Sequence, residues 1–390
     1  MGSKLLKIVF SKIKGVSFKV TLWDGDEFNV GTEEPSFKVI FKEPISEKDL
    51  ITSTSLALGE AYMDGNIIVE GDLYFALDKL LSAMDSFSTS YDKLPQIFKT
   101  LKTKNFQKKE VCSHYNLGND FYSLWLDKTL SYSCGYFKNE NDSLYDAQIN
   151  KIHHILKKLN LKEGMSLLDI GCGWGYLLIE AAKLYKVKGV GITLSEEQFK
   201  KCNERIKEEK LEDLVEVKLL DYRELKKSKL LFDRVVSVGM LEHVERKNYN
   251  LFFENVDSVL KKGGVFLLHY ISSLRESEGD AWIKKYIFPG GIIPSLREII
   301  YIAGEHNYHT IDVENLRLHY NKTLLKWYEN FNNNLYDISK DHDERFIRMW
   351  QVYLASCAAA FNNGIVDLHQ ILLTKGINNS LPIIRDYLYE

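Results

Sequence analysis

The sequence has few cysteines and few prolines for a chain of 390 residues. Its five cysteines are widely spaced and include no CxxC pair, so they indicate neither a disulfide framework nor a zinc site, and we predict no metal. Six prolines argue against long proline-rich linkers. Hydrophobic residues at 45% and charged residues at 27% exclude a disordered chain. At about 150 residues per domain, the length predicts two or three domains.

Long apolar segments are also missing. No run approaches the roughly 18 apolar residues that are needed to span a bilayer. The N-terminal segment lacks the apolar core and the small-residue cleavage site of a secretory leader. We therefore expect a cytoplasmic protein, which leaves association with a membrane surface open.

The charges of the two signs nearly balance. The 51 basic and 54 acidic residues give a formal net charge of −3, and a protein that binds nucleic acid through bulk charge is normally basic. We therefore expect no nucleic-acid partner. Residues 1–20 and 91–109 are nevertheless rich in lysine, with apolar residues between the lysines. This pattern is typical of a surface that binds anionic lipid, and a solvated linker has the same composition.

The order of predicted strands and helices indicates the fold class. Residues 1–90 predict a small N-terminal α/β domain, with strands at 16–22, 37–41 and 67–69 and helices at 48–63 and 72–84, and residues 91–109 predict a basic linker. Residues 110–390 predict an α/β domain with a parallel, doubly wound sheet of the Rossmann type. Its strands are expected at 166–170, 187–192, 215–219, 234–238, 264–269 and, last, 365–374. Residues 273–345 interrupt this alternation, and we expect them to form inserted helices.

A glycine-rich turn follows the first strand of this domain. Its pattern is Asp-x-Gly-x-Gly-x-Gly, which lets the chain turn tightly and lets a ligand approach the backbone. The spacing differs from the GxGxxG of dinucleotide-binding proteins, and Asp169 would repel a phosphate. An acid suits a cationic ligand, such as the ammonium and sulfonium groups of S-adenosylmethionine (SAM). The other predicted cofactor-binding residues of this turn are Gly171, Cys172, Gly173 and Gly175.

The next two strand ends predict how the rest of SAM is held. An acidic residue often follows the second strand and binds the ribose hydroxyls. Here Thr193 ends that strand, so we expect Thr193 and Gln198 to hold the ribose. Asp221 and Tyr222 follow the third strand, where Asp221 is positioned to accept a hydrogen bond from the adenine amino group.

Taken together, these segments resemble the cyclopropane-fatty-acyl-phospholipid synthases and their relatives, the mycolic acid cyclopropane synthases. Within the methyltransferase core, the resemblance rests on residues 168–175, 191–198, 221–223 and 236–244. Outside the core it rests on residues 114–122, 132–137, 286–291 and 319–324. It is strongest over residues 110–385. The mycolic acid enzymes lack the N-terminal domain, so its presence favours the phospholipid enzymes.

The resemblance implies a SAM-dependent methyltransferase that forms a cyclopropane ring at the cis double bond of an unsaturated acyl chain in a membrane phospholipid. Methyl transfer to one alkene carbon leaves positive charge on the neighbouring carbon, and loss of a proton from the new methyl group closes the ring. The resemblance implies that a bound bicarbonate takes this proton. The residues that match its cradle are Glu242, His269 and Tyr320, with backbone groups of Cys134 and Ile271.

Further expectations follow from the same resemblance. Tyr132, Ser133 and Leu194 are expected to join the SAM-binding residues, and the protein is expected to be a homodimer. The lysine-rich segments predict that it associates peripherally with the inner face of the cell membrane. Cys357 matches a cysteine that is often marked as active in this family. The reaction needs no covalent nucleophile, and a small thiol that packs a helix is the simpler interpretation.

Three alternatives remain open at this point. The same cation can end as a methyl-branched or methylene product. A small-molecule N-methyltransferase resembles the same core but does not need the basic, apolar N-terminal region. A lipid-binding protein with an inactive catalytic domain is a further possibility, against which the intact glycine turn argues.

Overall fold

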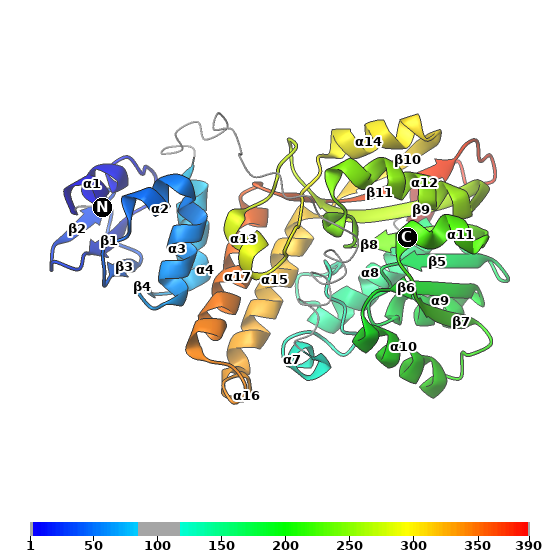
Figure 1. Ribbon diagram of the computed structural model, residues 1–390, viewed down its shortest axis with the longest axis horizontal. Coiled ribbons are helices and arrows are strands. Elements are labelled where there is room, and N and C mark those ends of the chain that lie inside the picture. Colours follow the sequence, from blue (N-terminus) through cyan, green and yellow to red (C-terminus); the bar gives the residue numbers. More distant parts are fainter. Residues whose placement is uncertain (1–2, 85–117, 389–390) are drawn as a thin grey trace. The chain divides into compact units, whose positions relative to one another are not determined.

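The computed structural model describes residues 3–84 and 118–388, and it contains two compact units (Figure 1). Of the described residues, unit 1 comprises 3–84, 280–287 and 324–365, and unit 2 comprises 118–279, 288–323 and 366–388. Residues 280–287 and 324–365, which we expected in the catalytic domain, thus group with the N-terminal residues. The predicted boundaries near residues 90 and 110 and the basic linker lie outside the described residues and stay predictions.

Unit 1 contains a four-stranded sheet in the order β2-β1-β3-β4. Burial alternates along β1, where Phe18 and Val20 are fully buried, as expected for a strand with one face on a core. The strands expected near residues 16–22, 37–41 and 67–69 are confirmed. The bounds are β1 (Phe18–Thr21), β2 (Glu27–Val30), β3 (Lys38–Phe41) and β4 (Ile67–Glu70).

Helices make up the rest of unit 1. We expected a single helix over residues 48–63, and this is wrong, because Ser53 has an extended backbone and its hydroxyl accepts a hydrogen bond from the N–H of Leu56, which starts a second helix. The helices are α1 (Ser3–Phe10), α2 (Glu47–Thr52), α3 (Thr54–Met63), α4 (Leu73–Ser82), α13 (Ala281–Tyr286), α16 (Leu335–Ile338) and α17 (Glu344–Asn362). Helix α15 (Arg317–Asn333) begins in unit 2, and its residues after Thr323 belong to unit 1.

Unit 2 is built on a seven-stranded sheet in the order β10-β11-β9-β8-β5-β6-β7. Strands β9, β8, β5, β6 and β7 are parallel, as predicted, and β11 runs antiparallel to both β9 and β10. The bounds are β5 (Ser166–Ile170), β6 (Lys188–Thr193), β7 (Val215–Leu219), β8 (Phe232–Val238), β9 (Leu260–Ser272), β10 (Tyr308–Asn315) and β11 (Asp367–Lys375).

Strand β10 lies in a segment where we expected only helices. Its alternation is inverted, since Asp312 is buried while Ile311 and Val313 are partly exposed. Asp312 tolerates burial because it forms ion pairs with Lys158 and Arg385. Because a polar residue occupies the inner face of β10, its sequence lacks the apolar alternation that predicts a strand.

Helices cover both faces of this sheet (Figure 1). Apolar residues of α8, α9 and α10 pack on one face, and those of α11, α12 and α14 pack on the other. The predicted doubly wound α/β sheet of the Rossmann type is therefore confirmed. The helices are α7 (Asn119–Ser123), α8 (Leu144–Lys158), α9 (Tyr176–Tyr185), α10 (Glu196–Glu208), α11 (Leu225–Ser228), α12 (Tyr249–Val259) and α14 (Leu296–Glu305). Ligands of such sheets bind at the carboxyl ends of the parallel strands.

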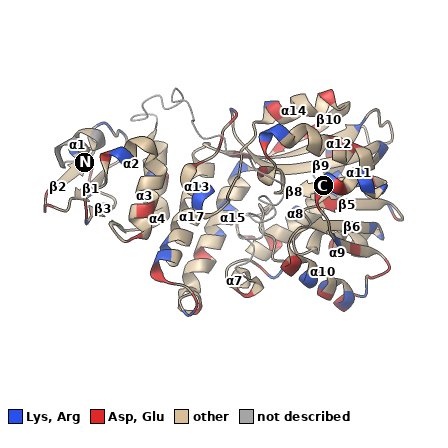
Figure 2. Cartoon of the chain, viewed as in Figure 1, with Lys and Arg blue, Asp and Glu red and all other residues tan. Residues whose placement is uncertain are grey.

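The surface of unit 2 carries charges of both signs. Acidic and basic residues share α10, for example, as Figure 2 shows. Over residues 3–84 and 118–388, no helix combines the length and the apolar character that crossing a membrane requires. In the same residues, no group of His, Cys, Asp and Glu side chains is arranged to hold a metal ion.

Candidate active site

The glycine-rich turn joins β5 to α9 and forms the floor of a pocket at the carboxyl ends of the parallel strands. The N–H groups of Gly171 and Cys172 donate to the carbonyl of Ile192, at 3.0 and 3.1 Å, which ties the turn to β6. Gly171, Gly173 and Gly175 all have positive φ angles, of 82°, 53° and 79°. Glycine adopts such angles at no steric cost, whereas other residues adopt them less readily, so glycine is favoured at each of these positions.

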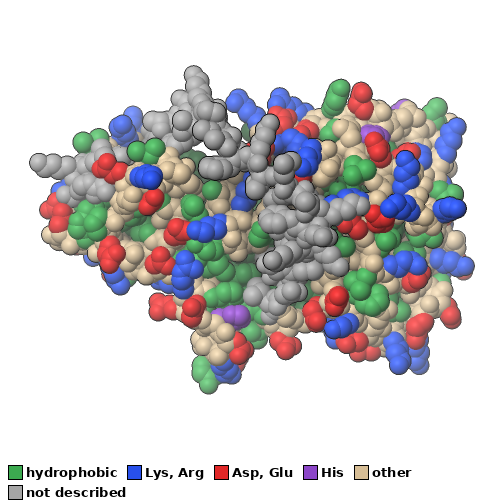
Figure 3. All heavy atoms as spheres, in the orientation of Figure 1, with side chains coloured by type: hydrophobic (Ala, Val, Ile, Leu, Met, Phe, Trp, Pro, Cys, Tyr) green, Lys and Arg blue, Asp and Glu red, His purple; other side chains and the backbone are tan. Residues whose placement is uncertain are grey.

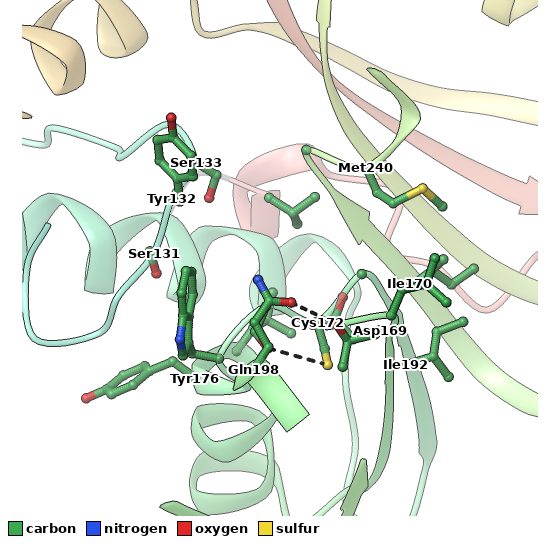
Figure 4. Close-up of a pocket in the computed structure, with 18 of the residues that line it drawn as sticks. Ser131, Tyr132, Ser133, Asp169, Ile170, Cys172, Tyr176, Ile192, Gln198 and Met240 are labelled. Atoms are coloured by element: carbon green, nitrogen blue, oxygen red, sulfur yellow. Dashed lines mark hydrogen bonds between the residues drawn. The ribbon is translucent and has the colours of Figure 1, made fainter. Parts of the chain in front are cut away.

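The pocket brings together almost all of the predicted SAM-binding residues (Figure 4). Tyr132 and Ser133 come from the segment before α8, while the others come from the ends of β5, β6 and β7. The predicted residues in its lining are Tyr132, Ser133, Asp169, Gly171, Cys172, Gly173, Thr193, Leu194, Gln198, Asp221 and Tyr222. Gly175 is not in the lining, and it acts instead at the start of α9, where it packs against Cys202.

One end of the pocket holds charges of opposite sign. Asp169 is buried, and its Oδ1 has no hydrogen-bond partner. Burial raises the pKa of Asp169 to about 7, although Lys151 opposes this. Lys151, from α8, is also buried in the lining, and its Nζ donates to Ser133 Oγ at 3.0 Å. Burial lowers the pKa of Lys151 to about 8, against the attraction of Asp127, Cys134 and Asp169.

Our reading of the sequence missed Lys151. A signal for it was available, because it follows Ala147 by four residues and precedes Ile155 by four, on the buried face of an amphipathic helix. A lysine on an apolar helix face is seldom fully buried without a partner. That position shows that the lysine needs a partner, but it does not show which other element supplies the partner.

The two residues predicted to bind the ribose, Thr193 and Gln198, form a pair of side chains in the pocket. The hydroxyl of Thr193 donates to Gln198 Oε1 at 2.7 Å and accepts from the N–H of Ser195 at 3.1 Å. Thr193 therefore orients Gln198, whose amide nitrogen is directed into the pocket (Figure 4). Of the two residues predicted to bind the ribose, Gln198 thus presents its amide to the pocket, and Thr193 holds Gln198 in place.

At the far end, Asp221 is already engaged by its neighbour. It accepts hydrogen bonds at 2.9 Å from the backbone N–H and from Nε of Arg223, and Nη2 of Arg223 donates to its second oxygen. Tyr222 also lines this end, and its hydroxyl is buried without a partner. Asp221 and Tyr222, both predicted to bind the cofactor, thus place polar groups at this end of the pocket.

The predicted base-binding residues lie next to this pocket. Glu242 is flanked by the lining residues Met240 and His243, and the lining residue Gly239 donates its N–H to the carbonyl of His269 at 2.8 Å. Glu242 Oε1 accepts a hydrogen bond from the N–H of Ile271 at 2.6 Å. Ile271 was expected to contribute a backbone group to the anion site, and its N–H positions Glu242.

A chain of backbone contacts brings in the other two predicted residues. Ile271 of β9 lies opposite Leu368 of β11, whose carbonyl accepts the N–H of Leu316 at 2.8 Å. The carbonyl of Leu316 in turn accepts the thiol of Cys134 at 3.9 Å and the N–H of Tyr320 at 3.1 Å. All five predicted residues are therefore grouped around the ends of β9 and β11, although no direct hydrogen bond between Glu242, His269 and Tyr320 is recorded among the described side chains.

Two buried atoms of this group have no hydrogen-bond partner, Oε2 of Glu242 and Nε2 of His269. Burial raises the pKa of Glu242 to about 7. Burial, with nearby Lys151 and Lys158, lowers the pKa of His269 to about 3, so this imidazole is neutral at physiological pH. Gln370 contacts its Nδ1 at 3.1 Å. Buried polar groups are normally paired, so these atoms indicate a site for a small polar ligand.

The two cysteines predicted among the catalytic residues have different surroundings. Cys134 is fully buried, and burial raises the pKa of its thiol. Cys357 lies on α17 of unit 1, whereas the other predicted catalytic residues lie in unit 2. Burial raises its pKa to about 12. Both thiols stay protonated at neutral pH, which is unsuited to a nucleophile.

Comparison with known proteins identifies the family. The family model described as mycolic acid cyclopropane synthetase matches residues 102–371. The chain belongs to the mycolic acid cyclopropane synthetase family. A second family model, described as a domain of unknown function, matches residues 5–92. All the predicted site residues of this family member fall within the first match.

Several known proteins of related sequence align with most of this chain. The cyclopropane-fatty-acyl-phospholipid synthase of Escherichia coli is 42% identical over 88% of this chain and 89% of its own. A probable fatty acid methyltransferase of Pseudomonas putida is 37% identical over 95% and 96%. Among solved structures, the cyclopropane synthase MmaA2 of Mycobacterium tuberculosis has a TM-score of 0.65 at 31% identity, covering 71% of this chain and 100% of its own.

A further solved structure of the cyclopropane synthetase family contains a ligand. The mycolic acid cyclopropane synthase CmaA1, complexed with SAH and CTAB, has a TM-score of 0.65 at 32% identity and covers 70% of this chain and 99% of its own. A coclaurine N-methyltransferase has a TM-score of 0.64 at 22% identity, which indicates a shared fold.

Proposed function

We propose that this protein is a SAM-dependent cyclopropane synthase that transfers a methylene group to the cis double bond of unsaturated acyl chains in membrane phospholipids. One observation carries the proposal: a pocket with an unpartnered acid at its glycine turn adjoins two further buried, unpartnered groups on Glu242 and His269. The name of the Escherichia coli relative supports the same reaction.

The lining of the pocket suits SAM along its whole length. It passes from Gly239, after β8, through the ends of β5 and β6 to Asp221, after β7. Four neighbouring strands span about 14 Å at their usual spacing of about 4.8 Å. We assign the amino acid end of SAM to the β5 side, the ribose to Gln198 and the adenine to Asp221 and Tyr222.

Aromatic rings near the glycine turn suit a carbocation. The ring of Phe288 lies 6.3 Å from that of Tyr132 and 6.0 Å from that of His243, and both of these residues line the pocket. An aromatic face stabilises a cation by about 0.5–2 kcal/mol in a dry site. An apolar passage that delivers the acyl chain to these rings stays a prediction.

The group around Glu242 and His269 fits a bicarbonate. A bicarbonate carries both a hydroxyl donor and acceptor oxygens, which match the carboxyl oxygen of Glu242 and the ring nitrogen of neutral His269, each without a partner. When bound, it would supply a base for the proton of the new methyl group. Ile271 holds Glu242 through its N–H, and Gln370 contacts the other ring nitrogen of His269. Tyr320 and Cys134 would border the same site.

The reaction is tested with purified protein, SAM, bicarbonate and vesicles of a monounsaturated phospholipid. The acyl chain is expected to gain the mass of one methylene group and to lose its alkene signal. Absence of this gain when bicarbonate is plentiful would reject the proposal.

Glu242→Gln tests the base-binding site. Glutamine retains an oxygen that accepts from Ile271 but loses the carboxylate, so turnover is expected to fall by about 10²- to 10⁴-fold while SAM affinity stays largely unchanged. Glu298→Gln, at a partly buried acid on α14, is the matched control and is expected to keep its activity. A loss of SAM affinity as large as the loss of turnover would refute this role of Glu242.

A fatty acyl methyltransferase that makes a branched or methylene product is the second candidate. The name of the Pseudomonas putida relative, which aligns with nearly the whole chain, favours it. A methylene product has the same mass as the ring product, so NMR of the ring protons must separate the two. Ring-proton signals would support the cyclopropane synthase, and their absence the alternative.

The resemblance also supports peripheral association with anionic membrane and a homodimer. Of the N-terminal lysines, Lys7 and Lys19 form ion pairs with Asp26 and Glu27, at 2.8 and 2.5 Å, which reduces the free positive charge there. On the displayed face, unit 2 carries interspersed acidic and basic side chains (Figure 3). We therefore assign the attraction to anionic lipid chiefly to the lysines of residues 91–109. Sedimentation equilibrium tests the dimer.

A further inference from the structure

Lys151 is a buried cation in the lining of the pocket, and the reaction described above gives it no role. Only 4% of its surface is exposed, and in the described part of the chain its ammonium donates one hydrogen bond, to Ser133 Oγ at 3.0 Å. An ammonium group has three protons to donate. Burial of a charge is unfavourable unless it is paired and hydrogen-bonded, so the remaining protons require an acceptor in the pocket.

Asp169 presents the complementary case in the same pocket. It is 3% exposed, it attracts Lys151, and its Oδ1 is buried without a partner. The pocket therefore contains, on its β5 side, one unsatisfied cation and one unsatisfied anion. A ligand that satisfies both must itself carry an anionic and a cationic group close together, as the amino acid part of SAM does.

We propose that Lys151 and Ser133 bind the α-carboxylate of SAM while Asp169 binds its α-ammonium group. The inference rests on the proposed function, because it specifies how that cofactor is recognised. Lys151 Nζ donates to Ser133 Oγ, so the hydroxyl proton of Ser133 is directed elsewhere and forms a second donor. A carboxylate accepts from both donors, and bonds of this charge-assisted kind are stronger than neutral ones.

The local charge supports this assignment. Lys151 lies in the electrostatic range of two acids, Asp127 and Asp169, so the three groups together carry one negative charge when all are ionised. SAM carries one net positive charge, from its sulfonium, ammonium and carboxylate groups. The bound site is thus neutral, which reduces the penalty for burying the charges.

The position of Lys151 in the fold supports it as well. The residue comes from α8, whose apolar side packs on the same face of the sheet as α9. Ile152, next in the chain, also lines the pocket. The ribose and adenine residues Gln198 and Asp221 follow β6 and β7, farther along the sheet. Lys151 is therefore at the end where the amino acid part of SAM lies.

The inference predicts discrimination by the carboxylate. Decarboxylated SAM keeps the adenine, the ribose, the sulfonium and the amine, but it offers Lys151 no acceptor. Calorimetry on the full-length wild-type protein is expected to give an affinity for SAM on the order of 10- to 100-fold higher than for decarboxylated SAM. Lys151→Met is expected to weaken SAM binding and to bind the two ligands about equally.

Two further variants separate recognition from folding. Lys151→Arg keeps a cation and is expected to retain part of the preference for SAM. Lys158→Met removes another buried lysine of α8, one that is paired with Glu314 and is outside the pocket lining, and it is expected to keep the full preference. A merely structural role of Lys151 would lower both affinities and leave their ratio unchanged.

The outcomes are distinguishable from a failure of the proposed function. No binding of SAM by the wild-type protein would reject that function. Binding of SAM with equal affinity for decarboxylated SAM would overturn the inference alone, and this comparison needs no variant. A preference for SAM that persists in Lys151→Met, or in Lys151→Gln if the methionine variant does not fold, would overturn it too.

Discussion

Glu242 is a carboxyl group buried without a full set of partners, and such a group makes stability depend on pH. Its pKa is about 7 in the folded protein, against 4.5 as the ordinary value. Between these values the folded state keeps a proton that the unfolded state releases, so stability falls as the pH rises towards 7. The buried carboxyl group of this ligand site therefore lowers the stability of the folded protein at neutral pH.

Glu242→Gln removes this titration. Relative to the wild type, the free energy of unfolding of the variant is expected to increase by about 2 kcal/mol between about pH 5.5 and about pH 8.5, at about 1.36 kcal/mol per pH unit up to the folded pKa. Urea unfolding at the two pH values measures the difference. Glu276→Gln is the control, since Arg297 holds the pKa of Glu276 low and this acid is ionised throughout the range. A difference that did not change with pH would show that Glu242 is not the titrating group.

Individual residues also mark how far the sequence was informative. The glycine turn was predictable because its constraints are local, and Gly171 needs its backbone angle whatever surrounds it. Lys151 was missed because its role depends on neighbours from other elements. Arg223 was missed because it hydrogen-bonds Asp221, the side chain that was expected to bind the cofactor. The grouping of Glu242 with Cys134 and Tyr320 came from the family resemblance, since these residues are far apart along the chain.

At the scale of the element, the start of α9 depends on one close approach. Gly175 has a positive φ, and a Cβ added to it would also lie 2.9 Å from Sγ of Cys202 on α10. Gly164 has nearly the same φ, of 80°, but open space around it. The two positions therefore separate backbone strain from steric overlap.

Gly175→Ala is expected to destabilise the protein by about 1–3 kcal/mol more than Gly164→Ala does, because overpacking adds to the strain that both share. Adding Cys202→Ala is expected to recover part of the loss in Gly175→Ala and none in Gly164→Ala. Thermal unfolding of the single and double variants gives these differences. Equal losses for the two alanine variants would mean that α10 moves aside without cost.

Helix α8 and strand β10 are joined by buried ion pairs. Lys158 Nζ lies 2.5 Å from Glu314 Oε2 and 3.4 Å from Asp312 Oδ2, and His154 Nε2 lies 2.7 Å from the same Glu314 oxygen. Burial alone would raise the pKa of Glu314, but His154 and Lys158 hold it at about 2. These charges explain why β10 escaped a prediction based on apolar alternation.

Lys158→Met is expected to cost about 3–5 kcal/mol, because it leaves buried carboxylates with fewer partners. Adding Glu314→Gln removes one of these charges, so the double variant is expected to be more stable than the sum of the two single losses implies. Lys207→Met, at an exposed position of α10, is expected to stay within about 0.5 kcal/mol of the wild type. Strictly additive losses in urea unfolding would contradict a coupled pair.

At the scale of the whole molecule, the proposed substrate lies in a membrane, and electrostatic attraction to it must decline with salt. The screening length is about 10 Å at 0.1 M salt and about 3 Å at 1 M. Each lysine near an anionic surface contributes about 1 kcal/mol. Residues 91–109 contain six lysines and one acid, Asp92, so this segment carries a high local positive charge.

Two variants with the same change in net charge test where this attraction resides. In the first variant, serine replaces six lysines of residues 91–109, namely Lys93, Lys99, Lys102, Lys104, Lys108 and Lys109. The other replaces the exposed lysines Lys200, Lys207, Lys210, Lys226, Lys229 and Lys262 of unit 2. In sedimentation with anionic vesicles at low salt, the first variant is expected to lose binding by well over tenfold and the second by much less, and the difference is expected to vanish as screening increases. Equal losses of vesicle binding in the two variants would assign the attraction to the net charge of the protein. Vesicle binding that does not change with salt would show that only apolar contacts contribute.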